Sequence, residues 1–353
     1  MYMLVGTYTN GSSSKGIYVY KIDIESGESK YISMTEIENP SYLTYSLDEK
    51  FVYAVTETGD LTTASANSFS FDKQQGTLKF LNKQLTQGED PCYIIADKVN
   101  RHLVTANYTG GSVTAFTLST DGSIDVSSKI ELLKFQGSGP DPRQKSPHLH
   151  CVVPSPGDGK YVYAMDLGSD RIHKFITSQV EKSQFLKPEP IEYFQLSPGS
   201  GPRHMEFHPS GKYAYLLNEL SGTVVVFQYV SDNGDLVEIQ SLEADEFHAQ
   251  GSADIHCTPD GKFLYTSHRL KGDGISIFSI NSSDGKLTKI GYQPTGIHPR
   301  NFIITPNGKY LLVANRDSNQ IQIFQINNTG ILNNINKDIQ LEKPVCLKFL
   351  SIK

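Results

Sequence analysis

The sequence predicts an all-β, seven-bladed β-propeller with four antiparallel strands in each blade. Two observations support this prediction. The first is an internal repeat with a spacing of 45 to 56 residues, which lies in the range of propeller blades. The second is a chain in which short runs rich in β-branched and aromatic residues alternate with turns containing glycine, asparagine and aspartate, with no helical spacing over a useful length.

Each copy of the repeat begins with a proline, or with a serine in one copy, followed by a short apolar run. The copies start at Pro40, Pro91, Pro147, Pro202, Ser252, Pro299 and Pro344. A second apolar run aligns across the copies at 51–57, 102–108, 161–167, 213–219, 263–269 and 310–316. A third run follows at 68–71, 112–118, 171–175, 223–229, 274–280 and 320–326, and a more polar fourth run closes the unit. Four strands per unit correspond to one blade.

The two ends of the chain supply complementary parts of one further blade. Residues 343–350 provide only a first strand, whereas residues 3–8, 16–22 and 29–36 provide a second, third and fourth. Joining the termini within one blade removes the open sheet edges of an incomplete ring. We therefore expect a single propeller domain over residues 1–353, with its last blade closed by the N- and C-terminal strands.

Composition and charge exclude several classes of function. Hydrophobic residues make up 38% of the 353 residues, and no apolar run approaches the roughly 18 residues of a membrane helix, which predicts a soluble protein without a membrane partner. The formal net charge is -6 with lysine and arginine thinly spread, so nucleic acid is not an expected partner. The N-terminus resembles a strand rather than a signal peptide, which predicts a cytoplasmic protein.

The sequence also lacks the usual motifs of metal and cofactor chemistry. Its cysteines lie far apart in different repeats and are expected to be reduced core thiols: Cys92, Cys151, Cys257 and Cys346. No zinc motif, calcium loop, glycine-rich phosphate loop or Ser-His-Asp order occurs at a credible spacing. We therefore expect neither a metal nor a cofactor, and any reaction would depend on acid, base and electrostatic groups.

Two sets of repeat positions are expected to meet on one face of the ring, because the start of a first strand lies beside the end of the antiparallel second strand. The position after the initial proline holds Ser41, Cys92, His148, Arg203, Ala253, Arg300 and Val345. The position that ends the second strand holds Tyr8, Glu57, Tyr108, Leu167, Glu219, Arg269 and Arg316. These positions predict a polar, net basic mouth of the central channel that could hold one small anion.

Each of these residues also has a structural interpretation. Arginine and glutamate at strand ends are often solvated rim residues, and the recurring asparagines Asn107, Asn218 and Asn315 suit turns or contacts between blades. His150 and His256 lie within first strands, where a hydrogen-bonded core histidine is as good an interpretation as a functional one. The convergence of the whole set on one face favours a site.

The chemistry expected at this mouth is hydrolysis of an activated ester. Glu219, flanked by Arg203 and a histidine, could activate water, while arginines stabilise an oxyanion and bind a phosphate or carboxylate. The long link 134–146 is rich in loop-forming residues and could partly cover one mouth of the channel.

Several motifs together resemble those of the seven-bladed propeller lactonases, which comprise propeller-type 6-phosphogluconolactonases and the related carboxy-muconate lactonizing enzymes. The similarity covers nearly the full chain. It rests on Pro147-His148-Leu149-His150, Gly201-Pro202-Arg203-His204, Asn218-Glu219-Leu220, the run 259–265 with Arg269, and His298-Pro299-Arg300-Asn301-Phe302.

The resemblance implies opening of 6-phosphogluconolactone to 6-phosphogluconate, a step of the pentose phosphate pathway, without a metal. It implies that the catalytic residues are His148, Arg203, Glu219 and Arg269, and it leaves open whether His148 or Glu219 is the general base. Position and adjacent motifs add as substrate-binding candidates Arg300, His204, Asn218, Arg316 and His256.

Two other functions remain open from the sequence. One is a lactonase or lactonizing enzyme acting on a different carboxylated lactone. The other is a propeller without enzymatic activity that binds a ligand or a protein partner on the same face, because one scaffold of this kind hosts many functions.

Overall fold

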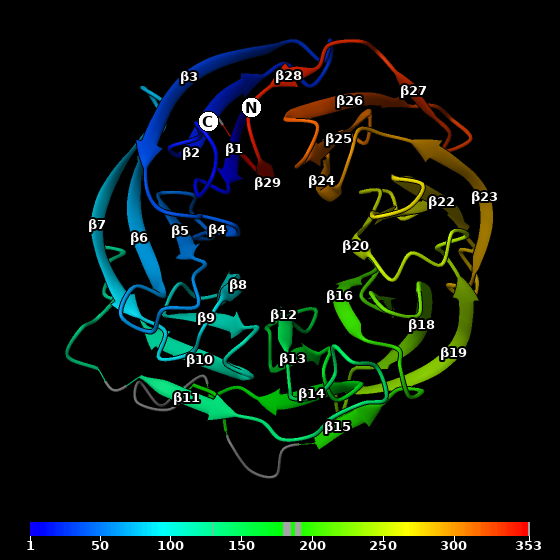
Figure 1. Cartoon of the computed structure of the whole chain (residues 1–353), viewed down its shortest axis with the longest axis horizontal. Coiled ribbons are helices and arrows are strands. Elements are labelled where there is room, and N and C mark those ends of the chain that lie inside the picture. Colours follow the sequence, from blue (N-terminus) through cyan, green and yellow to red (C-terminus); the bar gives the residue numbers. More distant parts are fainter. Residues whose placement is uncertain (129, 179–184, 188–191, 352–353) are drawn as a thin grey trace.

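Seven antiparallel sheets form a ring around a central axis (Figure 1). The computed structural model describes residues 1–128, 130–178, 185–187 and 192–351. The secondary structure of these residues is all β, which confirms the predicted fold class. No helix in the described part is long and apolar enough to cross a membrane.

Each blade has its first strand next to the axis and its fourth strand at the rim. From the axis outward the blades are β29 (Pro344–Leu350), β1 (Tyr2–Thr7), β2 (Gly16–Ile22) and β3 (Ser29–Glu36); β4 (Leu43–Tyr45), β5 (Phe51–Thr56), β6 (Ser65–Asp72) and β7 (Thr77–Leu85); β8 (Pro91–Ala96), β9 (His102–Asn107), β10 (Ser112–Thr117) and β11 (Glu131–Lys134); β12 (Leu149–Pro154), β13 (Tyr161–Asp166), β14 (Arg171–Ile176) and β15 (Glu192–Gln195); β16 (Pro202–Phe207), β17 (Tyr213–Asn218), β18 (Thr223–Val230) and β19 (Asp235–Glu243); β20 (Ser252–Cys257), β21 (Phe263–His268), β22 (Gly274–Ile280) and β23 (Leu287–Pro294); and β24 (Pro299–Ile304), β25 (Tyr310–Asn315), β26 (Gln320–Ile326) and β27 (Leu332–Asn334), with β28 (Ile339–Gln340) also paired to β26.

The ring closes through the two ends of the chain, as the sequence predicts. Strand β29 pairs antiparallel with β1, with Val5 opposite Leu347, and both termini lie in the same blade in Figure 1. Every blade therefore has four strands, and in the described part of the chain the free sheet edges are the first and last strands of each blade.

The hydrophobic core lies between neighbouring blades rather than in one central cluster. Val52 and Phe69 of one blade, for example, belong to the same buried cluster as Leu103 and Phe116 of the next. Second strands are buried along their whole length, as in β13 and β25, because a sheet covers each of their faces. This burial explains why their sequences are continuous apolar runs rather than alternating ones.

A tyrosine in several second strands joins its blade to the next one. The hydroxyl groups of Tyr163, Tyr215 and Tyr265 donate hydrogen bonds to backbone oxygens of glycines that lie 65 to 71 residues later in the chain, over distances of 2.5 to 2.9 Å. At one of these glycines, Gly285, φ is +72°, a conformation that favours glycine. These bonds hold the blades in a fixed relation.

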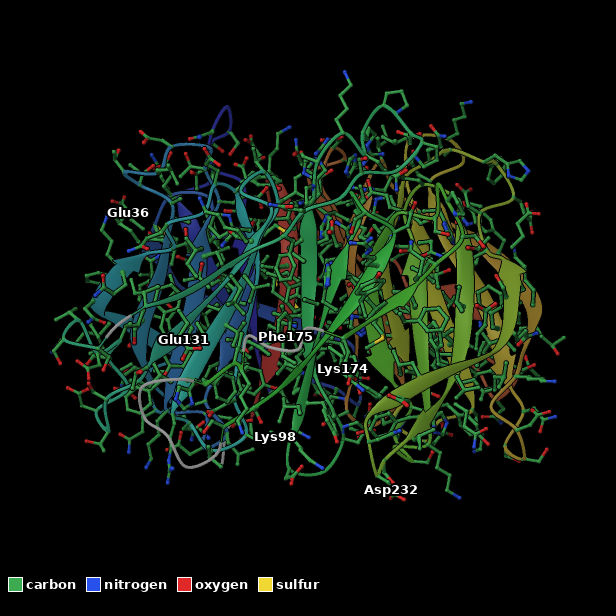
Figure 2. All side chains as sticks on the ribbon, turned by 90° about the horizontal axis from the view of Figure 1, so that it is seen from below. Glu36, Lys98, Glu131, Lys174, Phe175 and Asp232 are labelled. Atoms are coloured by element: carbon green, nitrogen blue, oxygen red, sulfur yellow. The ribbon has the colours of Figure 1, made fainter. Side chains whose placement is uncertain are left out.

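The two faces of the ring differ in what they present. We call the front face the one on which first strands begin and second strands end; it carries Glu57, Glu219 and Arg269. The back face carries the turns that join first to second strands and third to fourth strands, and Lys98 and Asp232 mark it at the bottom of Figure 2.

Candidate active site

A β-bulge near the start of the first strands shapes the front face. In β8, β12, β16 and β24 the pairing with the second strand shifts by one residue just after the first paired position. A bulge leaves one residue outside the regular ladder and re-aims its side chain. The residues in these bulges are Cys92, His150, Arg203 and Arg300.

This register corrects one sequence prediction. Counting from Pro147 placed His148 in the slot that Arg203 occupies in the next blade, but the structure places His150 in that slot. The physical reason is that β12 begins only at Leu149, two residues after the proline, whereas β16 begins at the proline itself. A count from the proline therefore shifts this one copy by two residues.

His148 lies instead on the loop that leads into β12, next to Tyr108 of the preceding blade. The two rings stack with centroids 4.5 Å apart, and Nδ1 of His148 is 3.0 Å from the backbone oxygen of Tyr108. A carbonyl oxygen only accepts hydrogen bonds, so Nδ1 carries the hydrogen and the lone pair of the neutral ring is on Nε2. Within the described residues, Nε2 has no hydrogen-bond partner, which leaves it free to take a proton.

His298 holds the equivalent position in another blade, but both of its nitrogens are engaged. Nε2 lies 3.2 Å from Nη1 of Arg269, from which it accepts a hydrogen bond, and Nδ1 lies 3.3 Å from a carboxylate oxygen of Asp317. Burial and the charge of Arg269 lower the pKa of His298 to about 2. Of these two equivalent histidines, only His148 has a ring nitrogen without a hydrogen-bond partner among the described residues.

Glu219 is the centre of a buried cluster of charges. Its carboxylate accepts hydrogen bonds from Nε of Arg203 at 2.8 Å, Nη2 of Arg269 at 2.9 Å and Nη2 of Arg143 at 2.5 Å. Burial acts to raise the pKa of Glu219, but the three guanidinium groups outweigh it and lower the pKa to about 2. Such a carboxylate is a weak base, and its role is to hold three arginines in fixed positions.

His150 lies beside the Glu219 cluster, and its ring is neutral near pH 7. Its Nε2 is 3.9 Å from a carboxylate oxygen of Glu219, and its Nδ1 is 3.7 Å from the sulfur of Cys92. Burial, followed by the charge of Arg203, lowers the pKa of His150 well below its ordinary value. We therefore interpret His150 as a neutral member of the channel wall.

Arg143 is a site residue that the sequence analysis did not select. It belongs to the predicted covering loop, and its Nη1 donates a 3.0 Å hydrogen bond to the backbone oxygen of Gln250 while its Nη2 binds Glu219. The buried side chain of Gln144 anchors the loop by donating to the backbone oxygen of Leu167 at 2.8 Å. The only sequence signal was the unusual length of this link.

The front face is positively charged where these groups meet. The cluster combines four arginines with two glutamates: Arg143, Arg203, Arg269, Arg300, Glu57 and Glu219. Arginine donors held in a low-dielectric site stabilise an anion or a developing oxyanion without reorganisation. The arrangement fits an ester or lactone that carries a negative charge.

Comparisons with known proteins agree with this geometry. The family model described as "Lactonase, 7-bladed beta-propeller" matches residues 2–349. The chain belongs to this family. A Formosa agariphila relative named 6-phosphogluconolactonase is 40% identical over 328 residues, which cover 92% of each chain.

Solved structures of the same fold extend the comparison. A Bacteroides fragilis protein is 53% identical with a TM-score of 0.95, and the match covers 99% of this chain and 98% of the other. The periplasmic gluconolactonase PpgL of Pseudomonas aeruginosa is 32% identical with a TM-score of 0.92 over 100% of this chain and 99% of its own. This propeller lactonase therefore shares its whole length with these proteins.

Two of the predicted substrate-binding residues are used within the protein. Asn218 is buried, and its side-chain amide donates a 2.9 Å hydrogen bond to Thr223 on the neighbouring strand. Arg316 donates two hydrogen bonds of 2.8 Å to the carboxylate of Asp317. Asn218 thus behaves as the structural interpretation expected, and Arg316 lies on the rim beside His298 rather than in the Glu219 cluster.

His204 stands behind Arg203 and does not reach the front face. It is 5% exposed; its Nε2 accepts a hydrogen bond from Nη1 of Arg203 at 3.1 Å, and its Nδ1 lies 2.7 Å from a carboxylate oxygen of Asp254. Burial and the neighbouring arginine lower the pKa of His204 to about 4, so it is neutral and can accept from Arg203. His204 therefore supports an arginine instead of contacting substrate.

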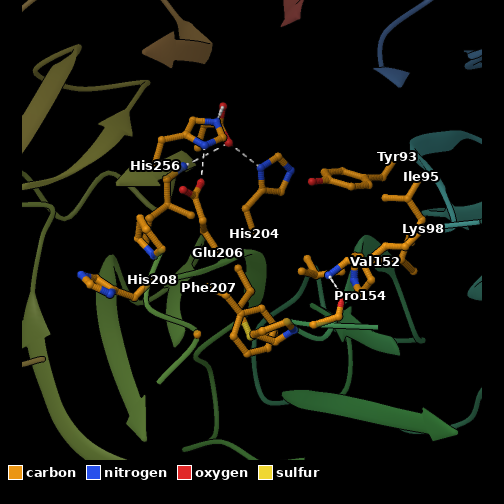
Figure 3. Close-up of a pocket in the computed structure, with 18 residues that line it drawn as sticks. Tyr93, Ile95, Lys98, Val152, Pro154, His204, Glu206, Phe207, His208 and His256 are labelled. Carbon is orange, nitrogen blue, oxygen red and sulfur yellow. Dashed lines mark hydrogen bonds and ion pairs between the residues drawn. The ribbon is translucent and has the colours of Figure 1, made fainter. Parts of the chain in front are cut away.

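The structure does not bring His256 to the front face, which corrects another prediction. His256 is the fifth residue of β20, and it lines a cavity of about 450 Å³ at the back face together with Lys98. One ring nitrogen of His256 contacts Glu206, as Figure 3 shows, and the other lies 3.1 Å from the carboxylate of Asp254, which also contacts His204. The repeat around Ser252 lacks the usual proline, and its alignment does not indicate how deep in the channel His256 lies.

The ion pairs of His256 give stability a defined dependence on pH. Burial alone would lower the pKa of His256, but Asp254 and Glu206 raise it to about 10. A histidine with a raised pKa contributes stability that is full below its unfolded pKa of roughly 6.5 and is lost as the pH rises towards 10. We therefore expect His256→Gln to lower the free energy of unfolding most at pH 6 and least at pH 10.

Urea unfolding of the wild type and of His256→Gln at pH 6, 8 and 10 measures this effect. His248→Gln, a change at an exposed histidine, is the matched control and should show no such trend. Equal losses for His256→Gln at all three pH values would contradict the prediction.

No group of three or more histidine, cysteine, aspartate or glutamate side chains among the described residues is arranged to hold a metal ion. All four cysteines are buried free thiols.

Proposed function

We propose that this protein hydrolyses 6-phosphogluconolactone to 6-phosphogluconate at the front face, with His148 as the general base. The observation that carries the proposal is the free Nε2 of His148 on the same face as a cluster of arginines held by one carboxylate. Membership of the lactonase family and the name of the Formosa relative support the reaction and the substrate.

The reaction needs one proton acceptor and one stabiliser of negative charge. Nε2 of His148 takes a proton from water as the water oxygen forms a bond to the lactone carbonyl carbon. Arg203 and Arg269 stabilise the resulting oxyanion. The tetrahedral intermediate then collapses, the bond from the carbonyl carbon to the ring oxygen breaks, and the imidazolium returns the proton to that oxygen. The products are a hydroxyl group and a carboxylic acid, which releases its proton to solvent and becomes a carboxylate.

Glu219 serves this reaction through the arginines it holds. Its pKa of about 2 disfavours a role as the proton acceptor, and this supports the assignment of the general base to His148 in our proposal. The positive charge of the front face supports a phosphorylated substrate, since arginine binds phosphate in a bidentate manner. A place in the pentose phosphate pathway and a cytoplasmic location complete the proposal, the latter supported by the free cysteines.

The test is hydrolysis of freshly prepared 6-phosphogluconolactone, followed by coupling to 6-phosphogluconate dehydrogenase. We expect a rate well above spontaneous ring opening and the same rate after treatment with EDTA. A rate equal to spontaneous opening contradicts the proposal, and a rate lost with EDTA and restored by a divalent metal contradicts its metal-independent part.

A second substrate has specific support. PpgL, which matches the chain over its whole length, is described as a gluconolactonase, and gluconolactone lacks the phosphate. Comparing kcat/KM for the two lactones decides between them: a preference for the phosphorylated lactone supports our proposal, and equal or higher values for gluconolactone favour the second substrate.

A further inference from the structure

Two glutamates occupy the same repeat position on the front face, but their surroundings differ. Glu219 has its carboxylate saturated by three arginines. Glu57 has one oxygen, Oε1, bound to the hydroxyl group of Tyr8 at 2.8 Å. Its other oxygen, Oε2, is buried and has no hydrogen-bond partner within the described residues. Buried acceptors are normally satisfied, so the exception needs an explanation.

Arg300 forms a long ion pair with this oxygen but no hydrogen bond. Nη2 of Arg300 is 3.9 Å from Oε2 of Glu57, and the guanidinium carbon lies 5.2 Å from the centre of the Tyr8 ring, as in a cation–π contact. The Arg300 side chain is 15% exposed. Within the described residues its guanidinium donates no hydrogen bond, in contrast to Arg203 and Arg269 in the same cluster.

The Ser41 side chain belongs to the same blade as Glu57 and is also unsatisfied. Ser41 occupies the slot just before β4, is 3% exposed, and its hydroxyl group has no hydrogen-bond partner in the described part of the chain. The backbone amide of Glu57 binds the oxygen of Asn39, two residues before Ser41, at 3.1 Å. The hydroxyl group of Ser41 and Oε2 of Glu57, both without a hydrogen-bond partner, therefore belong to the same blade.

The chemistry of Glu57 and Arg300 together selects one kind of ligand group. A hydroxyl group can donate to the free carboxylate oxygen while it accepts from a guanidinium group. A carboxylate or a phosphate dianion offers only acceptor oxygens and would be repelled by Glu57. The pair therefore suits the hydroxyl groups of a sugar rather than its anionic end.

We propose that Tyr8, Glu57 and Arg300 form a hydroxyl-recognition corner that selects polyhydroxylated lactones over lactones whose rings lack hydroxyl groups. Glu57 accepts from a substrate hydroxyl, Arg300 donates to it, and Tyr8 fixes the carboxylate. The corner rests on the proposed function for the identity of its ligand. It would explain on chemical grounds how one charged front face separates sugar lactones from carboxylated lactones without hydroxyl groups.

The experiment measures binding, which does not depend on catalysis. The probes are 6-phosphogluconate and 6-phosphohexanoate, which have the same chain length and the same two anionic ends but differ in their hydroxyl groups. We expect the wild type to bind 6-phosphogluconate more tightly by calorimetry. Glu57→Gln replaces the free acceptor by a donor and should weaken the binding of 6-phosphogluconate about tenfold or more. Binding of 6-phosphohexanoate should stay equal or tighten, because a negative charge has been removed.

These opposite responses separate recognition from structural damage. Three results would each overturn the proposal. Glu57→Gln could weaken the binding of both ligands equally, it could leave the binding of 6-phosphogluconate unchanged, or the wild type could bind both ligands with the same affinity. Glu38→Gln, at an exposed glutamate one residue before Asn39, removes the same charge nearby and should leave the preference intact.

A second pair of probes separates this proposal from the proposed function. D-gluconate and hexanoate repeat the comparison without phosphate, so the corner is tested even if the phosphorylated lactone is not the substrate. A preference for gluconate that is lost in Glu57→Gln supports the corner whatever the outcome of the hydrolysis assay.

Discussion

Replacing His148 with asparagine is expected to lower kcat by about 10²- to 10⁴-fold with little change in KM. The variant removes the proton acceptor, whose typical contribution has this size, while the arginines that bind the substrate remain. His148 is half-buried on the loop before β12 and outside the regular strands, so the fold should tolerate the change. Initial rates of lactone hydrolysis across pH and substrate concentration measure kcat, KM and any change in the pH profile.

The matched control for this experiment is His248→Asn, at an exposed histidine whose ring lies near Glu243 and contacts none of the cluster's arginines, which should retain full kcat. A His148→Asn enzyme with wild-type kcat and an unchanged pH profile would remove His148 from the mechanism. The base would then have to be sought elsewhere on the front face.

Replacing Glu219 with glutamine is expected to lower the free energy of unfolding by about 3 to 5 kcal/mol, the usual cost of removing one partner of a buried charge cluster. The change leaves Arg203 and Arg269 buried without a counter-charge, and kcat should fall because the two guanidinium groups lose their fixed positions. Urea unfolding at pH 7 and initial rates of hydrolysis measure the two effects.

The dependence of this loss on pH has a definite sign. The pKa of Glu219 in the folded protein is about 2, below its usual value near 4.3, so its stabilising contribution is present above pH 4 to 5 and is lost as the pH falls towards 2. The difference between the wild type and Glu219→Gln should therefore shrink in acid. Arg143→Gln is the control, because its side chain is 39% exposed and its loss should cost roughly 1 kcal/mol or less. Equal stability of Glu219→Gln and the wild type at pH 7 would contradict the prediction.

The sequence was sufficient for the architecture because strand, turn and repeat signals agree in every blade. Tyr213–Asn218, for example, is an apolar run between turns in the sequence and a fully paired second strand in the structure. The closing blade was also predictable, since a lone first strand at one end of the chain and three further strands at the other complete a four-stranded blade only by pairing with each other.

The register near the site was harder to predict. Strand β12 starts two residues after Pro147 without any change in the apolar pattern around it, so no periodicity indicates whether His148 or His150 occupies the slot. The depth of His256 along the channel was lost for a similar reason. A position in a strand tells which face a side chain lies on, but not which end of a channel it lines.

Contacts between distant segments were beyond any sequence pattern. Arg143 reaches Glu219 from a link 76 residues earlier in the chain, and only the folded ring brings the two together. The same holds for Arg300 and Glu57, which come from opposite ends of the sequence. What the sequence did predict correctly was the kind of residue gathered on the front face.

The closure of the ring by β29 and β1 affects the order in which the site is assembled during synthesis and folding. Arg300 comes from the blade before the closing one, Tyr8 from the closing blade, and Glu57 from the blade after it, so their contacts bridge the seam where the chain ends meet. During synthesis on the ribosome, Tyr8 and Glu57 emerge long before Arg300 can join them. A nascent or C-terminally truncated chain would hold much of the Glu219 cluster yet lack a finished seam, so selectivity for the sugar would be the last property the molecule acquires.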